Sequence, residues 1–323
     1  MSTTSLSEFA IIDRYFKSPP TSPEKNVIVG IGDDGAVLRV PTGQQLVVST
    51  DTLVSGIHFF PETPPGDIAY KSLAVNLSDL AAMGATPAWF TLALTLPQAE
   101  HDWLNAFSKD LLALAQQANI ALVGGDTTRG PLSITIQVMG LVPCQQSLLR
   151  NGAQVGDTIY VTGTLGDAGL ALHEYQQHHL SQSLDAEFLW QRLMRPEPRL
   201  QVGTALRGIA SSCIDISDGL IADLQHILTA SKVGAMLDVN QLPFSKALQR
   251  IDSAKAFELA LTAGDDYELC FTLPSANTPL LAERLASIHT RVTAIGHITE
   301  QLGFWDRSGK VLSVPKQGWQ HFE

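Results

Sequence analysis

Short apolar runs alternate with amphipathic helical patterns along the chain, and a polar, glycine-rich stretch at 151–157 divides it into two halves. Residues 66–83 carry alanine and leucine at helical spacing, and this pattern stops at Gly84. Residues 132–138 alternate apolar and polar side chains, as a half-buried strand does. The alternation predicts an α/β protein of two similar domains, with the boundary within 140–152.

The same patterns predict the individual elements. Strands are expected near 27–31, 36–40, 46–50, 89–94, 120–123, 132–138, 158–162, 213–216, 235–239, 267–273 and 291–298. Helices are expected near 5–17, 66–83, 100–118, 167–179, 199–210 and 219–230, in the stretch ending near 262, and near 279–287.

Composition narrows the class of protein. Hydrophobic residues make up 45% of the 323 and charged residues 16%, which excludes a disordered chain. The net charge of −11 disfavours nucleic acid and anionic membranes as partners. Cys144, Cys213 and Cys270 are far apart and indicate neither a disulfide framework nor a zinc site. Without a signal-peptide pattern or an apolar run approaching ~18 residues, a cytoplasmic protein is expected.

The segment Gly30–Gly35 fits the G-x-G-x-x-G pattern of dinucleotide and protein-kinase glycine loops. Its variable positions include Asp33 and Asp34, whose negative charges would face the phosphates. A strand-like run follows where a Rossmann loop requires a helix, and the sequence contains no Walker or protein-kinase motif. The Rossmann, protein-kinase and P-loop folds are therefore excluded.

Five segments share one design, in which an apolar strand or helix delivers aspartate to its end beside glycine, serine or threonine. They are 32–35, 49–52, 76–79, 124–130 and 215–219. If they converge, two carboxylates about 4 Å apart repel by about 4 kcal/mol at an effective dielectric of 20, so divalent cations are required among them. Oxygen ligands and a phosphate-bearing substrate favour Mg²⁺.

Each segment also has a purely structural interpretation, since one aspartate beside glycine is often a turn residue or a helix N-cap. Five such segments together favour the metal cluster. Arg129 lies within a glycine loop whose amides could hold a phosphate, and Arg150 could bridge phosphate oxygens or be a surface arginine. His58 on its own favours a structural role.

These segments resemble the thiamine-monophosphate kinase family, within the ATP-binding superfamily of aminoimidazole-ribonucleotide synthetase, almost from end to end. The runs 75–85 and 124–130 are typical of the superfamily, whereas 49–58, 215–220 and 266–269 indicate the kinase family. The chain lacks the N-terminal and C-terminal cysteines of two rival superfamily members.

The resemblance implies two α+β domains, with 1–145 carrying the ATP and magnesium sites and a sheet that pairs across a homodimer, and 146–323 forming a second α/β domain. It implies a cytoplasmic phosphotransferase that uses ATP and Mg²⁺ to convert thiamine monophosphate to thiamine diphosphate, the final step of thiamine diphosphate biosynthesis. Several Mg²⁺ ions are implied, and a monovalent cation is a further candidate.

The resemblance also implies roles for individual residues. The magnesium ligands would be Asp34, Ser49, Thr50, Asp51, Asp79, Asp126, Asp215 and Asp218. ATP would be held by Gly125, Asp126, Arg150 and Ser217, with Asp126 and Arg150 acting in catalysis. The thiamine phosphate would meet His58, Asp265 and Trp319, whose ring suits stacking on a cationic heterocycle.

One position departs from the family pattern. The family usually has glutamate where this chain has Asp265, which reaches about one methylene less far toward a substrate. Two alternatives to the kinase stay open: another superfamily enzyme that activates an amide or carboxylate oxygen with ATP, and a non-catalytic module that binds magnesium nucleotide and leaves it intact.

Overall fold

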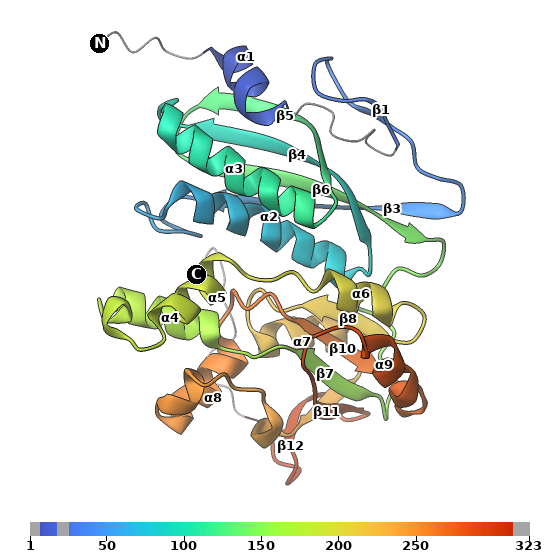
Figure 1. Ribbon diagram of the computed structural model, residues 1–323. Coiled ribbons are helices and arrows are strands. Elements are labelled where there is room, and N and C mark those ends of the chain that lie inside the picture. Colours follow the sequence, from blue (N-terminus) through green and yellow to red (C-terminus); the bar gives the residue numbers. More distant parts are fainter. Residues whose placement is uncertain (1–6, 18–25, 313–323) are drawn as a thin grey trace. The chain divides into compact units, whose positions relative to one another are not determined.

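The computed structural model describes residues 7–17 and 26–312, and Trp319 lies outside these residues (Figure 1). The chain divides into two compact units. Unit 1 comprises the residues up to Leu80 together with Thr86–Cys144. Unit 2 comprises Ala81–Ala85 together with the residues from Gln145 onward.

Unit 1 is built on a four-stranded sheet, which α2 and α3 cover on one face (Figure 1). Its strands, in spatial order, are β3 (Gln44–Val54), β6 (Ser133–Pro143), β4 (Thr86–Leu96) and β5 (Ala121–Arg129). The other elements are α1 (Glu8–Ile11), the π-helix η1 (Ile12–Phe16), β1 (Val27–Val29), β2 (Val37–Leu38), α2 (Pro65–Ala82) and α3 (His101–Gln117). Leu73, Leu77 and Leu80 of α2 are completely buried, as the predicted apolar stripe requires.

Unit 2 contains a six-stranded mixed sheet in the order β12-β9-β11-β7-β10-β8. The strands are β7 (Thr158–Thr162), β8 (Ser212–Asp215), β9 (Gly234–Leu237), β10 (Leu269–Leu273), β11 (Val292–Thr299) and β12 (Gly303–Asp306). The α-helices are α4 (Asp167–Gln176), α5 (Ala186–Met194), α6 (Leu200–Leu206), α7 (Leu220–Ser231), α8 (Ser253–Thr262) and α9 (Thr278–Leu285). The short 3₁₀ helices are η2 (Leu180–Gln182), η3 (Val239–Gln241), η4 (Leu248–Arg250) and η5 (Ser275–Asn277).

The strand expected at 120–123 is longer in the structure, because β5 continues through the presumed glycine loop to Arg129. Gly125 makes this continuation possible. A Cβ atom at this position would lie 1.9 Å from the backbone oxygen of Leu92 on β4. The sequence pattern indicated a loop at a place where glycine instead allows two strands to approach closely. Helix α5 and strand β12 were not expected from the sequence.

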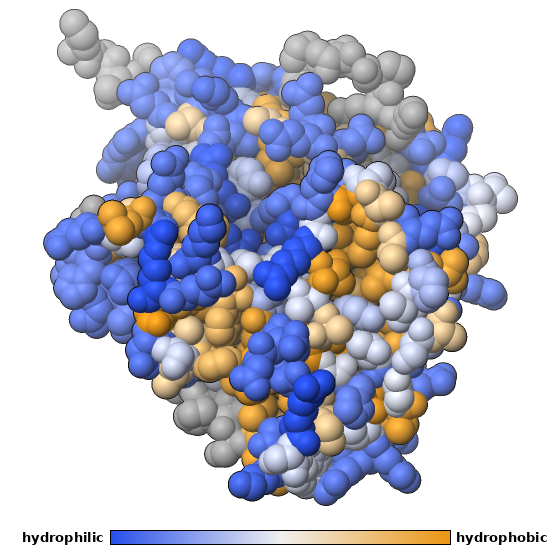
Figure 2. Space-filling view, turned by 60° about the horizontal axis from the view of Figure 1, so that its bottom comes forward, coloured by the Kyte–Doolittle hydropathy of each residue, from blue (hydrophilic) through white to orange (hydrophobic). Residues whose placement is uncertain are grey.

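The described residues form no helix that is both long and apolar enough to cross a bilayer. On the face seen in Figure 2, hydrophilic side chains separate the apolar ones into patches. In unit 1, the edge strand β3 exposes 43% of Leu46 and 51% of Val48, so one face of this sheet presents apolar side chains to its surroundings.

Candidate active site

In unit 1, strand β3 and helix α2 bring together three of the predicted metal ligands, Ser49, Asp51 and Asp79. The Ser49 hydroxyl donates to Asp79 Oδ2 at 2.5 Å, and the backbone N–H of Asp51 donates to Asn76 Oδ1 at 3.1 Å. Burial, and then the negative charge of Asp79, raise the pKa of Asp51 to about 6. The raised pKa shows that the folded chain disfavours the ionised form of Asp51, which a bound cation would favour.

Thr50 is not brought to this acidic pair. Along β3, Ser49 and Asp51 belong to one face of the sheet and Thr50 to the other, because side chains alternate along a strand. On that opposite face, Gln137 Nε2 donates to Thr50 Oγ1 at 3.3 Å. The side chain of Thr50 is therefore on the opposite face from Asp51 and Asp79.

A cavity of about 580 Å³ lies at the β5 side of the sheet of unit 1. Apolar side chains of the N-terminal helical segment line it, together with the loop before β2 and the strand residues 124–127. Asp34 and Asp126 also line this cavity. As β5 is an edge strand, alternate backbone N–H groups of its glycine-rich part point away from β4. The cavity thus combines apolar walls, backbone polar groups and carboxylates.

The sheet separates Asp126 from Asp51 within one chain. Strand β3 forms one edge of the sheet and β5 the other. Asp51 pairs with Ile136 of β6, and Asp126 pairs with Ala93 of β4. Three strand spacings of about 4.8 Å place the two edges roughly 14 Å apart. The four predicted acidic segments that belong to unit 1 therefore do not form one cluster within a single chain.

His58 has a structural contact of its own. Its Nδ1 accepts a hydrogen bond of 3.0 Å from the backbone N–H of Val54, at the end of β3. This contact fixes the tautomer of the neutral ring, with the proton on Nε2. The imidazole therefore closes a turn with one nitrogen and has a donor on the other.

In unit 2, a carboxylate that the sequence analysis missed shapes the loop with Asp215, Ser217 and Asp218. Asp223, in the first turn of α7, accepts hydrogen bonds on Oδ2 from the backbone N–H groups of residues 217, 218 and 219, at 3.0, 3.0 and 3.1 Å. Burial raises the pKa of Asp223 to about 7, although these backbone hydrogen bonds oppose the rise. The four-residue spacing from Gly219 to Asp223 is the sequence signal for this contact, since residues 219 and 223 are one helical turn apart.

The loop with Asp265 is joined to this segment by backbone hydrogen bonds. The N–H of Asp265 donates to the carbonyl of Ser217 at 2.9 Å, and the N–H of Tyr267 donates to the carbonyl of Ile216 at 2.8 Å. These bonds extend the antiparallel pairing of β8 with β10. The structure therefore brings Asp215, Ser217, Asp218 and Asp265 together.

Arg150 lies at the outer side of the same strand. The backbone N–H of Cys213, in β8, donates to the carbonyl of the neighbouring Leu149 at 2.9 Å. Arg150 itself is exposed, and its backbone carbonyl accepts a hydrogen bond from Ser231 Oγ at 3.5 Å. Its guanidinium is accessible at the β8 edge of unit 2.

The donor chemistry of unit 1 fits Mg²⁺. Ser49, Asp51 and Asp79 offer oxygen atoms, and the two carboxylates repel each other. Within residues 7–17 and 26–312, however, no group of three or more histidine, cysteine or acidic side chains could hold a metal ion. Mg²⁺ is commonly bound by one or two carboxylates, with water and substrate phosphate completing its coordination. The residues present fit that mode of binding.

Two family descriptions match the chain: "AIR synthase related protein, N-terminal domain" over residues 32–142 and "AIR synthase related protein, C-terminal domain" over residues 154–304. The thiamine-monophosphate kinase of Salmonella typhimurium is 50% identical over 320 residues, which cover 98% of each chain. The thiamine-monophosphate kinase of Bacillus subtilis is 33% identical over 330 residues, covering 98% of this chain and all of the relative.

Solved structures show the same similarity. The crystal structure of thiamine-monophosphate kinase from Stenotrophomonas maltophilia matches with a TM-score of 0.84 and 49% identity, over 89% of this chain and 93% of that chain. A structure described as AaThiL complexed with AMPPCP and TMP matches with a TM-score of 0.77 and 29% identity, over 100% and 99% of the two chains.

Proposed function

The chain belongs to the AIR synthase related family, among the thiamine-monophosphate kinases, and from this premise we propose that it transfers the γ-phosphoryl group of ATP to thiamine monophosphate. The similarity to the Salmonella kinase at 50% identity, over 98% of both chains, carries this proposal. The products are thiamine diphosphate and ADP.

The cavity of unit 1 is the proposed nucleotide site. Its apolar wall suits a purine ring, and the edge-strand amides near Gly125 suit a phosphate oxygen. Asp126 lines the same cavity, where it could hold a phosphate-bound Mg²⁺. The AaThiL structure that contains AMPPCP, an ATP analogue, supports a nucleotide site in this fold. Arg150 and Ser217 of unit 2 are the further proposed contacts to ATP.

Magnesium is the proposed cofactor. Asp51 and Asp79 with the Ser49 hydroxyl would hold it in unit 1, and Thr50 is a further proposed ligand from the sequence resemblance. Asp34 and Asp126 are the proposed ligands at the cavity, and Asp215 and Asp218 those of unit 2. Bound Mg²⁺ supplies positive charge that neutralises the transferring phosphoryl group. A monovalent cation is a further proposed component.

For the acceptor substrate we propose contacts with His58, Asp265 and Trp319. His58 Nε2 can donate to a phosphate oxygen, because Nδ1 is engaged by the N–H of Val54. The carboxylate of Asp265 is complementary to the positive charge of the thiazolium ring. Trp319 is assigned from the sequence resemblance alone.

Direct in-line transfer needs no covalent intermediate on the protein. The attacking group is a phosphate oxygen that is already ionised at neutral pH, so a strong general base is unnecessary. The protein's residues then serve to position the two substrates and to balance their charge. Radiolabel from γ-labelled ATP that stays on denatured protein would contradict this mechanism.

The proposed assembly is a homodimer formed through the sheet of unit 1. Leu46 and Val48 are exposed on this sheet, and association would remove their apolar surface from water. Association along the sheet could also bring together its two edges, which hold Asp51 and Asp126 about 14 Å apart in a single chain.

The proposed activity is tested by following ADP and thiamine diphosphate formation from ATP, Mg²⁺ and thiamine monophosphate, with free thiamine as the control. Equal amounts of the two products, formed from the monophosphate alone, are expected. ATP binding without product would favour the non-catalytic module, and ATP turnover only with another acceptor would favour a different superfamily enzyme.

A further inference from the structure

The loop that carries Asp265 has an unusual backbone. Asp265 and Tyr267 both have left-handed conformations, with φ angles of +67° and +51°. Residues with a Cβ atom rarely adopt this region because it is sterically strained, so the surrounding structure must enforce it. The hydrogen bonds to the carbonyls of Ser217 and Ile216 account for the backbone amides of Asp265 and Tyr267. The side chains of the loop supply the remaining constraint.

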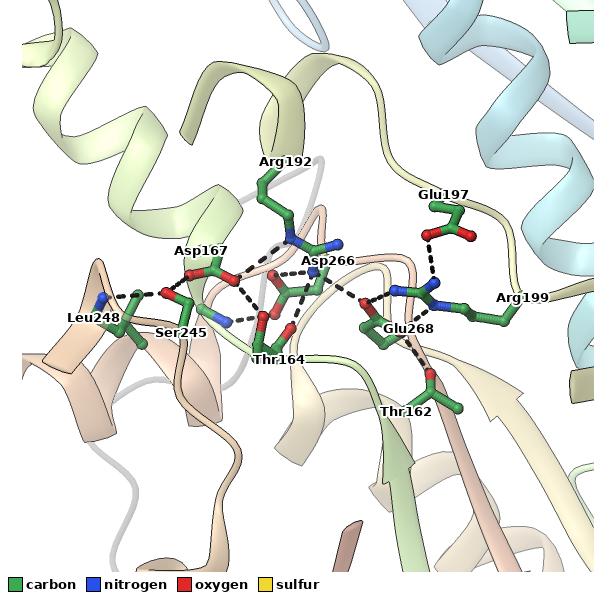
Figure 3. A network of polar contacts seen from close by, with 11 residues as sticks. Thr162, Thr164, Asp167, Arg192, Glu197, Arg199, Ser245, Leu248, Asp266 and Glu268 are labelled. Atoms are coloured by element: carbon green, nitrogen blue, oxygen red, sulfur yellow. Dashed lines mark hydrogen bonds and ion pairs between the residues drawn. The ribbon is translucent and has the colours of Figure 1, made fainter. Parts of the chain in front are cut away.

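Side chains of this loop alternate between two environments. Asp265 and Tyr267 are half-buried, and the Tyr267 hydroxyl donates to Asp265 Oδ1 at 3.2 Å. Asp266 and Glu268 are 1% and 0% exposed and belong to the buried polar network shown in Figure 3. The positions of the half-buried Asp265 and Tyr267 therefore depend on their buried neighbours in the sequence, Asp266 and Glu268.

Arg199 anchors one end of the network. Its Nε and Nη2 atoms donate to the two carboxylate oxygens of Glu268 at 2.6 and 2.7 Å, and Thr162 Oγ1 donates to Glu268 at 2.6 Å. Burial on its own would raise the pKa of Glu268, but Arg199, Arg192 and Thr162 hold it below its usual value. Glu268 is therefore a charged, fully bonded anchor at the start of β10.

Arg192 of α5 has a different geometry, because it is shared among three acids. Its Nη2 lies 3.1 Å from Glu268 Oε1 and 3.9 Å from Asp266 Oδ1, and its Nε lies 3.5 Å from Asp167 Oδ2 (Figure 3). The same Nη2 donates to the carbonyl of Thr164 at 3.0 Å. Among the described residues, Arg192 Nε and Asp266 Oδ1 are buried atoms without a hydrogen-bond partner.

Asp266 is held from a second direction. The backbone N–H of Gly166, which precedes α4, donates to Asp266 Oδ2 at 2.6 Å. The network therefore connects α4, α5 and the acidic loop, and Arg192 is the cation at their junction. Removing Arg192 would take away the positive charge that faces Asp167, Asp266 and Glu268 together.

We propose that Arg192 is a positioning residue for the acceptor substrate, because it holds Asp266 and Glu268 and thereby fixes the strained loop that presents Asp265. This role rests on the proposed kinase function, in which Asp265 meets the cationic thiamine moiety. An aspartate at position 265 cannot compensate for a displaced backbone by extending its side chain, so correct placement of the loop matters more here than for the longer glutamate.

The first test compares Arg192→Met, which removes the charge, with Arg192→Lys, which keeps the charge and loses the planar fork. We expect KM for thiamine monophosphate to rise about tenfold in R192M and less in R192K, with KM for ATP unchanged in both. If R192M does not fold, R192K carries the test. An unchanged KM for the acceptor in the folded variants would overturn the proposal.

Ile298→Ala is the matched control for lost stability. Ile298 is 1% exposed on β11, in the same sheet but on a strand that does not pair with β8 or β10. This variant removes buried volume without touching the network, so both KM values should equal those of the wild type. A rise in the acceptor KM of I298A equal to that of R192M would show a general stability effect and contradict positioning.

A double-mutant cycle with Asp265→Asn tests whether Arg192 acts through Asp265. If it does, R192M raises the acceptor KM in the wild-type background and has no further effect in the D265N background. Equal rises in both backgrounds would overturn the proposal.

Hydrogen exchange tests the loop independently of activity. The amides of Asp265 and Tyr267 should exchange at least about tenfold faster in R192M than in the wild type, whereas the β11 amides should not change. Unchanged loop amides would refute positioning even in an active kinase. Absence of thiamine diphosphate from the wild-type assay would instead refute the kinase proposal. The hydrogen-exchange rates would still test whether Arg192 fixes the loop that carries Asp265.

Discussion

Two acids, the half-buried Asp51 of unit 1 and the buried Glu268 of unit 2, have pKa values that move in opposite directions. In unit 1, burial and the neighbouring charge of Asp79 raise the pKa of Asp51 to about 6. In unit 2, Glu268 is fully buried, yet the hydrogen bonds and charge of Arg199, with Arg192, hold its pKa below the usual value. Burial on its own would raise both. The comparison indicates that Glu268 is neutralised by arginines of the chain itself, whereas Asp51, beside Asp79, is suited to a cation from solution.

The largest effect on stability is expected from removing the ion pair between Arg199 and Glu268 in unit 2. Arg199→Met leaves Glu268 buried without its two-point partner, which should lower the free energy of unfolding by about 3–5 kcal/mol. Urea unfolding measures the loss. The double variant R199M/E268L should recover much of it, because both charges are then gone. A single variant as stable as the wild type would show that the pair does not stabilise unit 2.

A second prediction is that removing a carboxylate from unit 1 lowers activity without lowering stability. Asp51→Asn removes a carboxylate that repels Asp79, so without Mg²⁺ the variant should be at least as stable as the wild type. Its turnover should fall about a hundredfold, because charge stabilisation of the transferring phosphoryl group is weakened. Thermal unfolding and steady-state kinetics measure the two effects. A strongly destabilised D51N would mean that Asp51 is structural, like Glu268.

A third prediction concerns Asp223, which engages backbone amides and no arginine that the structure shows. Asp223→Ala leaves three N–H groups at the start of α7 without their acceptor and should cost about 2 kcal/mol of unfolding free energy. Asp223→Asn keeps an acceptor oxygen and should cost less. Chemical unfolding of both variants provides the comparison, and equal losses would count against the hydrogen bonds as the cause.

A fourth prediction concerns the change of stability with pH. Burial raises the pKa of Asp266 from 3.8 to about 8, against the opposing charge of Arg192, so the folded chain keeps this proton where the unfolded chain loses it. The contribution of Asp266 to stability is therefore greatest below pH 3.8 and falls as the pH rises toward about 8. Asp266→Asn cannot lose a proton there, so Tm(D266N) minus Tm(wild type) should increase from pH 5 to pH 8. A difference that stays constant would contradict the raised pKa.

Elements with strong periodicity were predictable from the sequence, and α2 is the clearest case, because its buried leucines recur at helical spacing. The extension of β5 beyond Gly125 was not, since the same glycines that suggest a loop also permit close strand pairing. The aspartate segments indicated the acidic pair at Asp51 and Asp79. The separation of Asp126 from that pair depends on strand order, which a single sequence does not contain.

The arginine network was missed for a related reason. Arg192 and Arg199 contact Asp266 and Glu268 only through tertiary folding, across about seventy positions of sequence. No local pattern marks an arginine as the partner of a distant acid. The motif 265–268 drew attention to the acids, and only the structure shows what neutralises them.

The account is tested most directly by magnesium-dependent stabilisation, measured as the Tm of wild type and D51N with and without Mg²⁺, in the presence of AMPPCP. Binding to the folded state raises Tm, so the wild type should gain stability with Mg²⁺ and D51N should gain much less. Equal gains in the two proteins would show that Asp51 does not hold the metal and would contradict the different roles assigned to Asp51 and Glu268.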